Sequence, residues 1–291
     1  MPLVVATHSG PFHADDVMAV ALIRQFVDSD ARIVRTRDKA TLEEADLVVD
    51  VGGIFDPEQG RFDHHQASYE GPLSAAGMVL AWLQETGRMG EAGYRALREG
   101  VMAYLDDVDN GRRPPDPEVL CFPRIVEALG QGAQDGEAFD KAFDTAVEFA
   151  TAFLKGWVAG RQALARAQAV VAGAMQAAEE RGSNILALDT YLKWKEPYFA
   201  NGGEQHPTQY VLFPGTEGNW RVVAIPPRFG EFGQKRSLPE SWAGLTDGEL
   251  EKKTGVEGSI FCHKNRFIAV FETRDGALRA LESAGLLMGQ A

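Results

Sequence analysis

The feature that most restricts the fold of this 291-residue chain is the alternation of short apolar runs and an apolar helix pattern near its N-terminus. Residues 3–6 are a short apolar run that is predicted to be a buried strand, and residues 31–35 and 46–51 are two further strand candidates. Residues 17–23 are apolar on nearly every side and follow two acidic residues, which predicts a buried helix. This order predicts right-handed crossovers and a mostly parallel sheet with helices on both faces.

Helical patterns dominate the middle of the chain. Residues 73–85 and 92–105 carry apolar residues at helical spacing. Residues 137–180 are rich in Ala, Phe, Val, Leu and Gln, with Gly156 and Gly160 as the weak points. A single helix of that length is uncommon in a globular protein, so we predict two helices there, the second bridging two lobes.

The last third of the chain changes to short strands separated by Gly, Pro and Asn. Five strands and one final helix are predicted, at residues 185–188, 209–213, 220–225, 259–262, 267–271 and 274–286. These elements predict a smaller α+β domain. We therefore expect an N-terminal α/β domain over residues 1–136, a helical connector over 137–182 and a C-terminal domain over 183–291.

Composition excludes several classes of protein. Hydrophobic residues make up 45% and charged residues 24%, which is typical of a globular enzyme. The longest apolar stretch, residues 17–23, is far shorter than the roughly 20 residues of a membrane-spanning helix. The N-terminus lacks the features of a secretory signal, and Cys121 and Cys262 match no zinc or redox spacing. We expect a cytoplasmic protein that does not enter a membrane.

The net charge is −13, from 42 acidic and 29 basic residues, and the acidic excess lies before residue 219. An acidic region without a basic stripe is poorly suited to binding duplex DNA through its phosphates. Two interpretations remain. Either the substrate is small, or the acidic region holds metal cations that reverse the local charge.

Four of the six histidines lie in the first 65 residues, close to aspartates. Each of these residues follows a predicted strand or begins the predicted helix. They are His8, His13, Asp15, Asp50 and the adjacent Asp63, His64 and His65. In an open parallel sheet, the C-terminal ends of the strands converge on one crevice. We therefore expect these side chains to meet, although they are distant in sequence.

Such a group of side chains has the chemistry of a metal centre. Imidazole nitrogens together with carboxylate oxygens favour Mn²⁺, Co²⁺, Fe²⁺ or Zn²⁺. One tetrahedral zinc ion needs four ligands, and the group has more than four candidate ligands. Two ions that share a carboxylate therefore fit the number of ligands better. Two ions about 4 Å apart can hold a phosphate and stabilise its attacking and leaving oxygens. Asp106, Asp107 and Asp109 add a further acidic group at the end of a predicted helix.

Most of these residues also have a simpler interpretation when taken one at a time. Asp15 can be an acid that favours a helix N-terminus, and Asp50 can begin a turn. His8 can be a hydrogen-bonded loop residue, and the acids at 106–109 can belong to a turn after a helix. The adjacent acid and two histidines at 63–65 are harder to explain in this way, and the joint occurrence favours the metal centre.

The chain resembles a known group of phosphoesterases. Segments similar to the motifs of the DHH phosphoesterase superfamily lie at residues 7–16, 49–53, 61–66 and 106–111. Within it, segments similar to the melanocyte-proliferating-gene exonuclease family lie at residues 193–196, 236–245 and 260–268. The resemblance covers nearly the whole chain and implies a DHH-like N-terminal domain. It also implies two divalent metal ions, for which we expect Mn²⁺ first, with Mg²⁺, Co²⁺ or Zn²⁺ as alternatives.

The resemblance also implies roles for individual residues. It assigns to the first ion His8, His13 and Asp50, and to the second ion Asp15, Asp50, His64 and one acid of the group at 106–109, for which we favour Asp109 and then Asp106. Asp63 would orient His64, as metal-bound imidazoles usually require. His65 would face the scissile phosphate as a hydrogen-bond donor.

The C-terminal domain is expected to bind the substrate. The side chains with suitable donors for phosphate oxygens are Lys195, Lys235, Arg236 and His263. Trp194 or Trp242 could stack on a base. The alternative for all of these residues is ordinary surface charge and core aromatics.

Three functions remain open from the sequence. The first is the one that the resemblance implies, a metal-dependent phosphodiesterase acting on RNA or short oligonucleotides from the 3′ end and releasing 5′ mononucleotides. The second is a small-molecule phosphohydrolase that uses the same metals on pyrophosphate, cyclic dinucleotides or nucleotides. The third is a non-catalytic protein whose metal supports folding or partner binding. Self-association into a homo-oligomer is compatible with each function.

Overall fold

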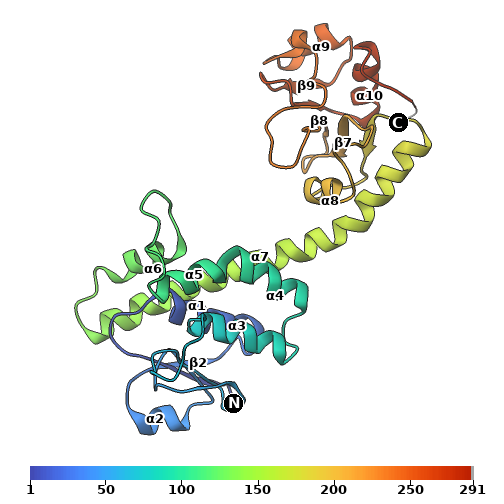
Figure 1. The fold of residues 1–291 in the computed structure, drawn as a ribbon. Helices are drawn as coiled ribbons and strands as arrows, with labels where there is room; N and C mark the ends of the chain where they lie inside the picture. The colour runs from blue at the N-terminus through green and yellow to red at the C-terminus, as the bar shows by residue number, and fades with distance from the viewer. Residues whose placement is uncertain (290–291) are drawn as a thin grey trace. The chain divides into compact units, whose positions relative to one another are not determined.

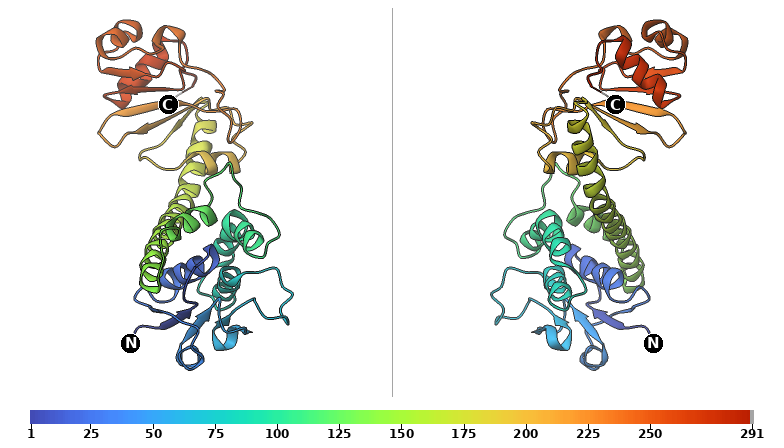
Figure 2. Two further views of the ribbon diagram at one scale, coloured as in Figure 1. Left: turned by 90° about the vertical axis from the view of Figure 1, so that its left-hand side faces the viewer. Right: turned by 90° about the vertical axis from the view of Figure 1, so that its right-hand side faces the viewer.

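The computed structural model describes residues 1–289 (Figures 1 and 2). The chain divides into two compact units, Met1–Ala159 and Gly160–Ala291, and we describe each by itself. In the described residues, no helix has the length and apolar character required to cross a membrane.

The first unit is built on a five-stranded mixed sheet. Its strands are β1 (Val4–Thr7), β2 (Arg32–Arg35), β3 (Leu47–Val49), β4 (Phe55–Asp56) and β5 (Arg61–Phe62). The order across the sheet is β2-β1-β3-β5-β4, and only the edge strand β4 is antiparallel to its neighbour. The first three strands confirm the predicted ones, and the α/β class is confirmed. The pair β4 and β5 was not predicted, because two residues are too few to show a period.

Helices pack on one face of this sheet. They are α1 (Ala14–Phe26), α3 (Ala75–Glu85), α4 (Glu91–Leu97), the π-helical turn Arg98–Met102, α5 (Ala103–Asp109) and α6 (Phe122–Gly130). The predicted apolar run of α1 lies fully inside the core, with residues 17–23 at 0% exposure. Each valine, leucine, isoleucine and methionine side chain of this run contributes about 1.5–3 kcal/mol when buried. This burial fixes the N-terminus of α1 at the end of β1.

The other face of the sheet is nearly bare. It carries one short helix, α2 (Lys39–Glu44), which has no buried residue, and the 3₁₀ turn Pro57–Gln59 lies near the edge strand. A small cluster around Val48 and Val51 packs against Leu42 of α2. Helices were predicted on both faces, but on this face the cover is limited to one short helix. The reason is that few residues are available between β2 and β3. In Figure 1, α1 and α3 lie on one side of the sheet and α2 on the other.

The predicted pair of helices over residues 137–180 is wrong, because the chain forms one 45-residue helix, α7 (Gly136–Glu180). Glycine costs only about 1 kcal/mol relative to alanine inside a helix, so Gly156 and Gly160 do not interrupt it without a proline nearby. Each unit buries its own part of α7. Phe143 and Val147 lie in the core of the first unit, and Val171 lies in the core of the second.

The second unit contains another five-stranded mixed sheet. Its strands are β6 (Ile185–Ala187), β7 (Tyr210–Pro214), β8 (Trp220–Ala224), β9 (Ser259–Cys262) and β10 (Ile268–Phe271). The order is β6-β7-β8-β10-β9, with β6 parallel to β7 and the other pairs antiparallel. All five predicted strands are confirmed, with bounds that differ by at most one residue at either end.

Alternation along β7 shows how both faces of this sheet are buried. Tyr210 and Leu212 point into a core covered by α9 (Asp247–Thr254) and α10 (Arg274–Ser283). Val211 and Phe213 point into a second core that includes residues of α7 and α8 (Lys195–Ala200). A 3₁₀ turn, Glu240–Trp242, completes the unit. The final helix confirms the predicted one, and α8 and α9 were not predicted.

Candidate metal centre

The predicted ligands come from segments that end at one edge of the first sheet. His8 directly follows β1, Asp50 follows β3, and His64 follows β5. Asp15 lies in the first turn of α1, and Asp109 is the last residue of α5. Because the strands are parallel, their C-terminal ends open on the same crevice. The topology thus brings together residues that are up to about one hundred positions apart.

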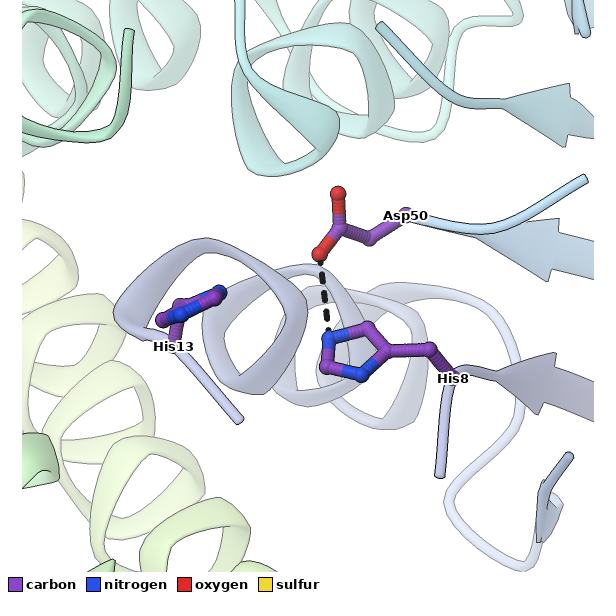
Figure 3. Close-up of side chains that lie close together, drawn as sticks. All are labelled: His8, His13 and Asp50. Carbon is purple, nitrogen blue, oxygen red and sulfur yellow. Dashed lines mark ion pairs between the residues drawn. The ribbon is translucent and has the colours of Figure 1, made fainter. Parts of the chain in front are cut away.

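The first group of ligand atoms belongs to His8, His13 and Asp50. One atom from each of these residues lies within 4.8 Å of the others. The Nε2 atom of His8 is 3.3 Å from an Asp50 oxygen, and the centroids of the two imidazole rings are 6.0 Å apart. Figure 3 shows the three side chains facing a common space from β1, α1 and β3.

A second group surrounds His64. Its Nε2 atom is 3.1 Å from an oxygen of Asp109, 3.4 Å from Asp50 and 3.8 Å from Asp15. The Asp50 oxygen in this group, Oδ1, differs from the Oδ2 that faces His8. One carboxylate therefore joins the two groups, with one oxygen in each.

The backbone at Asp50 has an unusual conformation. Its φ is +56°, in the left-handed region that residues other than glycine rarely adopt. Its amide is held by a hydrogen bond to the carbonyl oxygen of Phe62. Strained residues of this kind are concentrated at functional sites, where the surrounding fold holds them in place.

Several polar atoms in this centre are buried and have no hydrogen-bond partner among the described residues. They are Oδ1 of Asp15, Oδ2 of Asp16, Oδ1 of Asp50 and Nε2 of His64. An unsatisfied buried polar atom costs about 1–3 kcal/mol, and more when it is charged. A cation bound among them would satisfy carboxylate oxygens and an imidazole nitrogen together. The residues present therefore fit divalent metal ions.

The protonation of the site without metal reflects this crowding. Burial disfavours the charged form of His8 and His64, but the aspartates that lie 3.1–3.4 Å from their Nε2 atoms raise the pKa of each histidine to about 10. Burial disfavours ionised Asp50, but the two neighbouring histidines lower its pKa to about 2. Burial and the charges of Asp50 and Asp109 raise the pKa of Asp15 well above its ordinary value. Without metal, His8 and His64 are therefore both positively charged at neutral pH.

Asp63 orients His65 and not His64, which corrects the pairing that the resemblance implied. The carboxylate of Asp63 lies 2.7 Å from Nδ1 of His65 and also accepts from the amides of His65 and Gly53. Nδ1 of His64 instead lies 3.3 Å from the side-chain oxygen of Asn110. The His65 side chain is 62% exposed, so its ring is held at one nitrogen and open at the rim of the site.

The acidic group at the end of α5 separates into different roles. Asp109 reaches the centre, whereas the Asp106 carboxylate accepts from the amide and hydroxyl of Ser74 and pairs with Arg98. Asp107 pairs with Arg112 at 2.7 Å. Asp106 is therefore a buried link between α5 and the start of α3, and it lies outside the converging groups.

Two residues of the centre were not identified from the sequence. Asp16 lies 3.1 Å from Nε2 of His8, and its other oxygen accepts from the amide of His13. Asn110 contacts His64 as described above. An acid at the start of a helix and an asparagine in a turn are both common without any such role, so the sequence alone does not identify Asp16 or Asn110.

In the second unit, the two central basic candidates have partners within the protein. The three N–H groups of Lys235 donate to the Tyr198 hydroxyl and to the carbonyl oxygens of Gly203 and His206. Burial lowers the pKa of Lys235. Arg236 donates to the carbonyl oxygen of Gly285. These contacts hold the C-terminal unit together.

The other candidates of this unit differ in exposure. Lys195 is exposed beside the Trp194 ring, and Nδ1 of His263 accepts from the amide of Asn265. Trp194 and Trp242 are 5% and 1% exposed and belong to the cores. Both tryptophans are thus core aromatics, and the base-stacking alternative is wrong for them.

Comparisons with known proteins match nearly the whole length of the chain to one family. The family model MYG1_exonuc, described as an uncharacterised protein family (UPF0160), matches residues 4–284. A protein of Chlamydia pneumoniae named MYG1 protein is 36% identical over 284 residues, which cover 97% of this chain and 96% of that protein. A human protein named MYG1 exonuclease is 31% identical over 321 residues, which cover 95% and 84% of the two chains.

Proposed function

Because this chain belongs to the MYG1 exonuclease family, we propose that it is a metal-dependent phosphodiesterase of the DHH superfamily. In this proposal it acts in the cytoplasm on RNA or short oligonucleotides from the 3′ end and releases 5′ mononucleotides. The human, rat and mouse relatives are each named MYG1 exonuclease, which supports a nuclease activity.

The observation that carries the proposal is the convergence of buried ligand atoms without hydrogen-bond partners. His8, His13 and Asp50 would hold one divalent cation, as their grouping supports. Asp15, Asp50, His64 and Asp109 would hold the second. We expect Mn²⁺, with Mg²⁺, Co²⁺ or Zn²⁺ as alternatives. When bound, such a pair supplies the positive charge that a phosphodiester needs for attack on phosphorus.

In this proposal, His65 donates a hydrogen bond to the substrate phosphate. The Asp63 carboxylate lies 2.7 Å from Nδ1 of His65, and the same nitrogen lies 3.4 Å from Oδ1 of Asp50. The exposed ring lines a cavity together with His8 and Asp50. Asp63 acts through His65 and is a positioning residue.

A second cavity beside the centre favours a nucleotide substrate. It has a volume of about 570 Å³ and is shared with His13, His65 and Asp109. Its other walls are mainly apolar, including Pro11, Phe12, Leu105, Pro115, Pro123 and Phe139. Such a cavity suits the flat apolar face of a base and has few groups that would distinguish one base from another.

The small-molecule phosphohydrolase remains the alternative, because the net charge of −13 disfavours a long polyanion. Turnover on short RNA, cyclic dinucleotides and pyrophosphate under the same conditions separates the two functions. Our proposal expects RNA and linear dinucleotides to be the best substrates. Pyrophosphate as the best substrate would favour the alternative.

The proposal is tested with variants of the shared ligands. With Mn²⁺ present, Asp50→Asn or His64→Ala should lower RNA hydrolysis at least a hundredfold while circular dichroism shows an intact fold. Asp107→Asn is the matched control, since Asp107 lies two residues from Asp109 but pairs with Arg112, and it should retain activity. Full activity in either ligand variant rejects the proposal.

A further inference from the structure

Arg37 is an exposed arginine at the same sheet edge as the candidate metal centre. It lies two residues after β2, on the loop that leads into α2. In the described part of the chain its guanidinium makes no ion pair and no side-chain hydrogen bond. By contrast, Arg35 pairs with Asp140 and donates to the carbonyl oxygen of Gly10. An arginine that is free in this position can bind an anion.

The backbone around Arg37 is held rigidly although its side chain is free. The amide of Thr36 donates to the carbonyl oxygen of Thr7 at 2.7 Å, and the Thr36 hydroxyl accepts from the amide of Asp38. The Asp38 carboxylate accepts from both the amide and the hydroxyl of Thr41. The nearest acid in sequence, Asp38, therefore caps α2 and makes no ion pair with Arg37.

Arg37 lies where two cavities meet. The first, of about 570 Å³, contains His8, Asp50 and His65 of the candidate metal centre. The second, of about 680 Å³, lies on the nearly bare face of the sheet. Both are lined by Arg37, Val51 and Gly52, so the surface continues from the metal centre over Gly52 to the second face.

The second cavity has the mixed character of an oligonucleotide surface. Its cations are Arg37, Lys39 and Arg61, and its acids are Glu43 and Asp56. The Asp56 carboxylate is engaged with Gln59. Its apolar lining includes Leu42, Val51 and Ile54, of which Ile54 is 54% exposed. Cations beside exposed apolar side chains suit phosphates alternating with bases.

We propose that Arg37 binds the phosphate adjacent to the scissile one, and that the oligonucleotide continues from it over Gly52 into the second-face cavity. This inference rests on the proposed function and adds to it a binding site for the part of the substrate that is not cleaved. The guanidinium can hold two oxygens of one phosphate, which lysine cannot do. The site therefore favours substrates with at least two internucleotide phosphates.

The test compares a dinucleotide with a tetranucleotide of RNA, neither with a terminal phosphate, in Mn²⁺. Arg37→Ala should lower kcat/KM at least tenfold more for the tetranucleotide than for the dinucleotide, mainly through KM. Arg37→Lys should recover part of the loss. The slope of log KM against log salt should fall by about 0.7, as expected for one lost phosphate contact on a single strand. Arg32→Ala, exposed on β2 outside both cavities, is the control and should match the parent protein.

An equal loss on both substrates, or no loss on either, would overturn this role for Arg37. Binding of a labelled tetranucleotide, measured by fluorescence anisotropy with Ca²⁺ replacing Mn²⁺, separates the inference from the proposed function. If the parent protein binds but does not hydrolyse, the proposed function fails. Weaker binding by Arg37→Ala in that case would still support the phosphate site, and unchanged binding would reject it.

Discussion

At the scale of single residues, the centre depends on Asp50. Its two oxygens face different histidines, and its left-handed backbone directs the carboxylate between them. The sequence indicates a strand and a turn around Asp50, and in the structure Asp50 directly follows β3. It could not show the positive φ, since an aspartate before two glycines is common in turns without any such role.

The raised pKa values of His8 and His64 predict that metal binding releases protons. Both imidazoles have a pKa of about 10 in the metal-free protein, so they are protonated at pH 7.5, whereas a metal ligand must be neutral. Mn²⁺ affinity should rise with pH up to about 10. The free energy of unfolding of the metal-free protein should instead fall as the pH rises. The stabilisation that comes from a raised histidine pKa is complete below pH 6.5 and is lost as the pH rises through 10.

Calorimetric titration of Mn²⁺ at pH 7.5, in buffers of different ionisation enthalpy, measures this release. We expect more than one proton per protein molecule. A binding enthalpy that does not depend on the buffer would mean that the two imidazoles are not ligands.

At the scale of elements, residues of one acidic group serve different purposes because of the helix that carries them. Asp106 and Asp109 are three positions apart on α5, yet only Asp109 reaches His64. Asp106 is 0% exposed and is satisfied by Ser74 and Arg98. Sequence spacing favoured Asp109 because it lies beside the turn, but it could not show that a distant arginine and serine engage Asp106.

This division predicts opposite effects for two matched substitutions. Asp106→Asn should lower the free energy of unfolding by about 3 kcal/mol, because it breaks a buried charged pair, and should leave Mn²⁺ stoichiometry unchanged. Asp109→Asn should leave the stability of the metal-free protein within about 1 kcal/mol and weaken Mn²⁺ binding. Urea unfolding with EDTA and metal analysis after gel filtration measure both. Reversed effects would place Asp106 in the centre.

At the scale of the whole molecule, the sequence predicted the α/β class, most of the strands and the convergence of ligands, since apolar runs and parallel strand ends follow general rules. It failed where the outcome depends on small energies or on long-range packing. The unbroken helix α7 shows the first case, because Gly156 and Gly160 cost only about 1 kcal/mol each, too little to interrupt a helix. Trp194 and Trp242 show the second case. A tryptophan in the sequence fits a base-stacking surface as well as a core, and only the packing shows that both are buried.

Crystals of the protein soaked in Mn²⁺ and measured for anomalous scattering at the manganese edge test the central claim most directly. The account predicts two peaks on opposite sides of the Asp50 carboxylate, one beside His8 and His13, the other beside Asp15, His64 and Asp109. No peak at these side chains, or a peak at Asp106 in place of them, would contradict it.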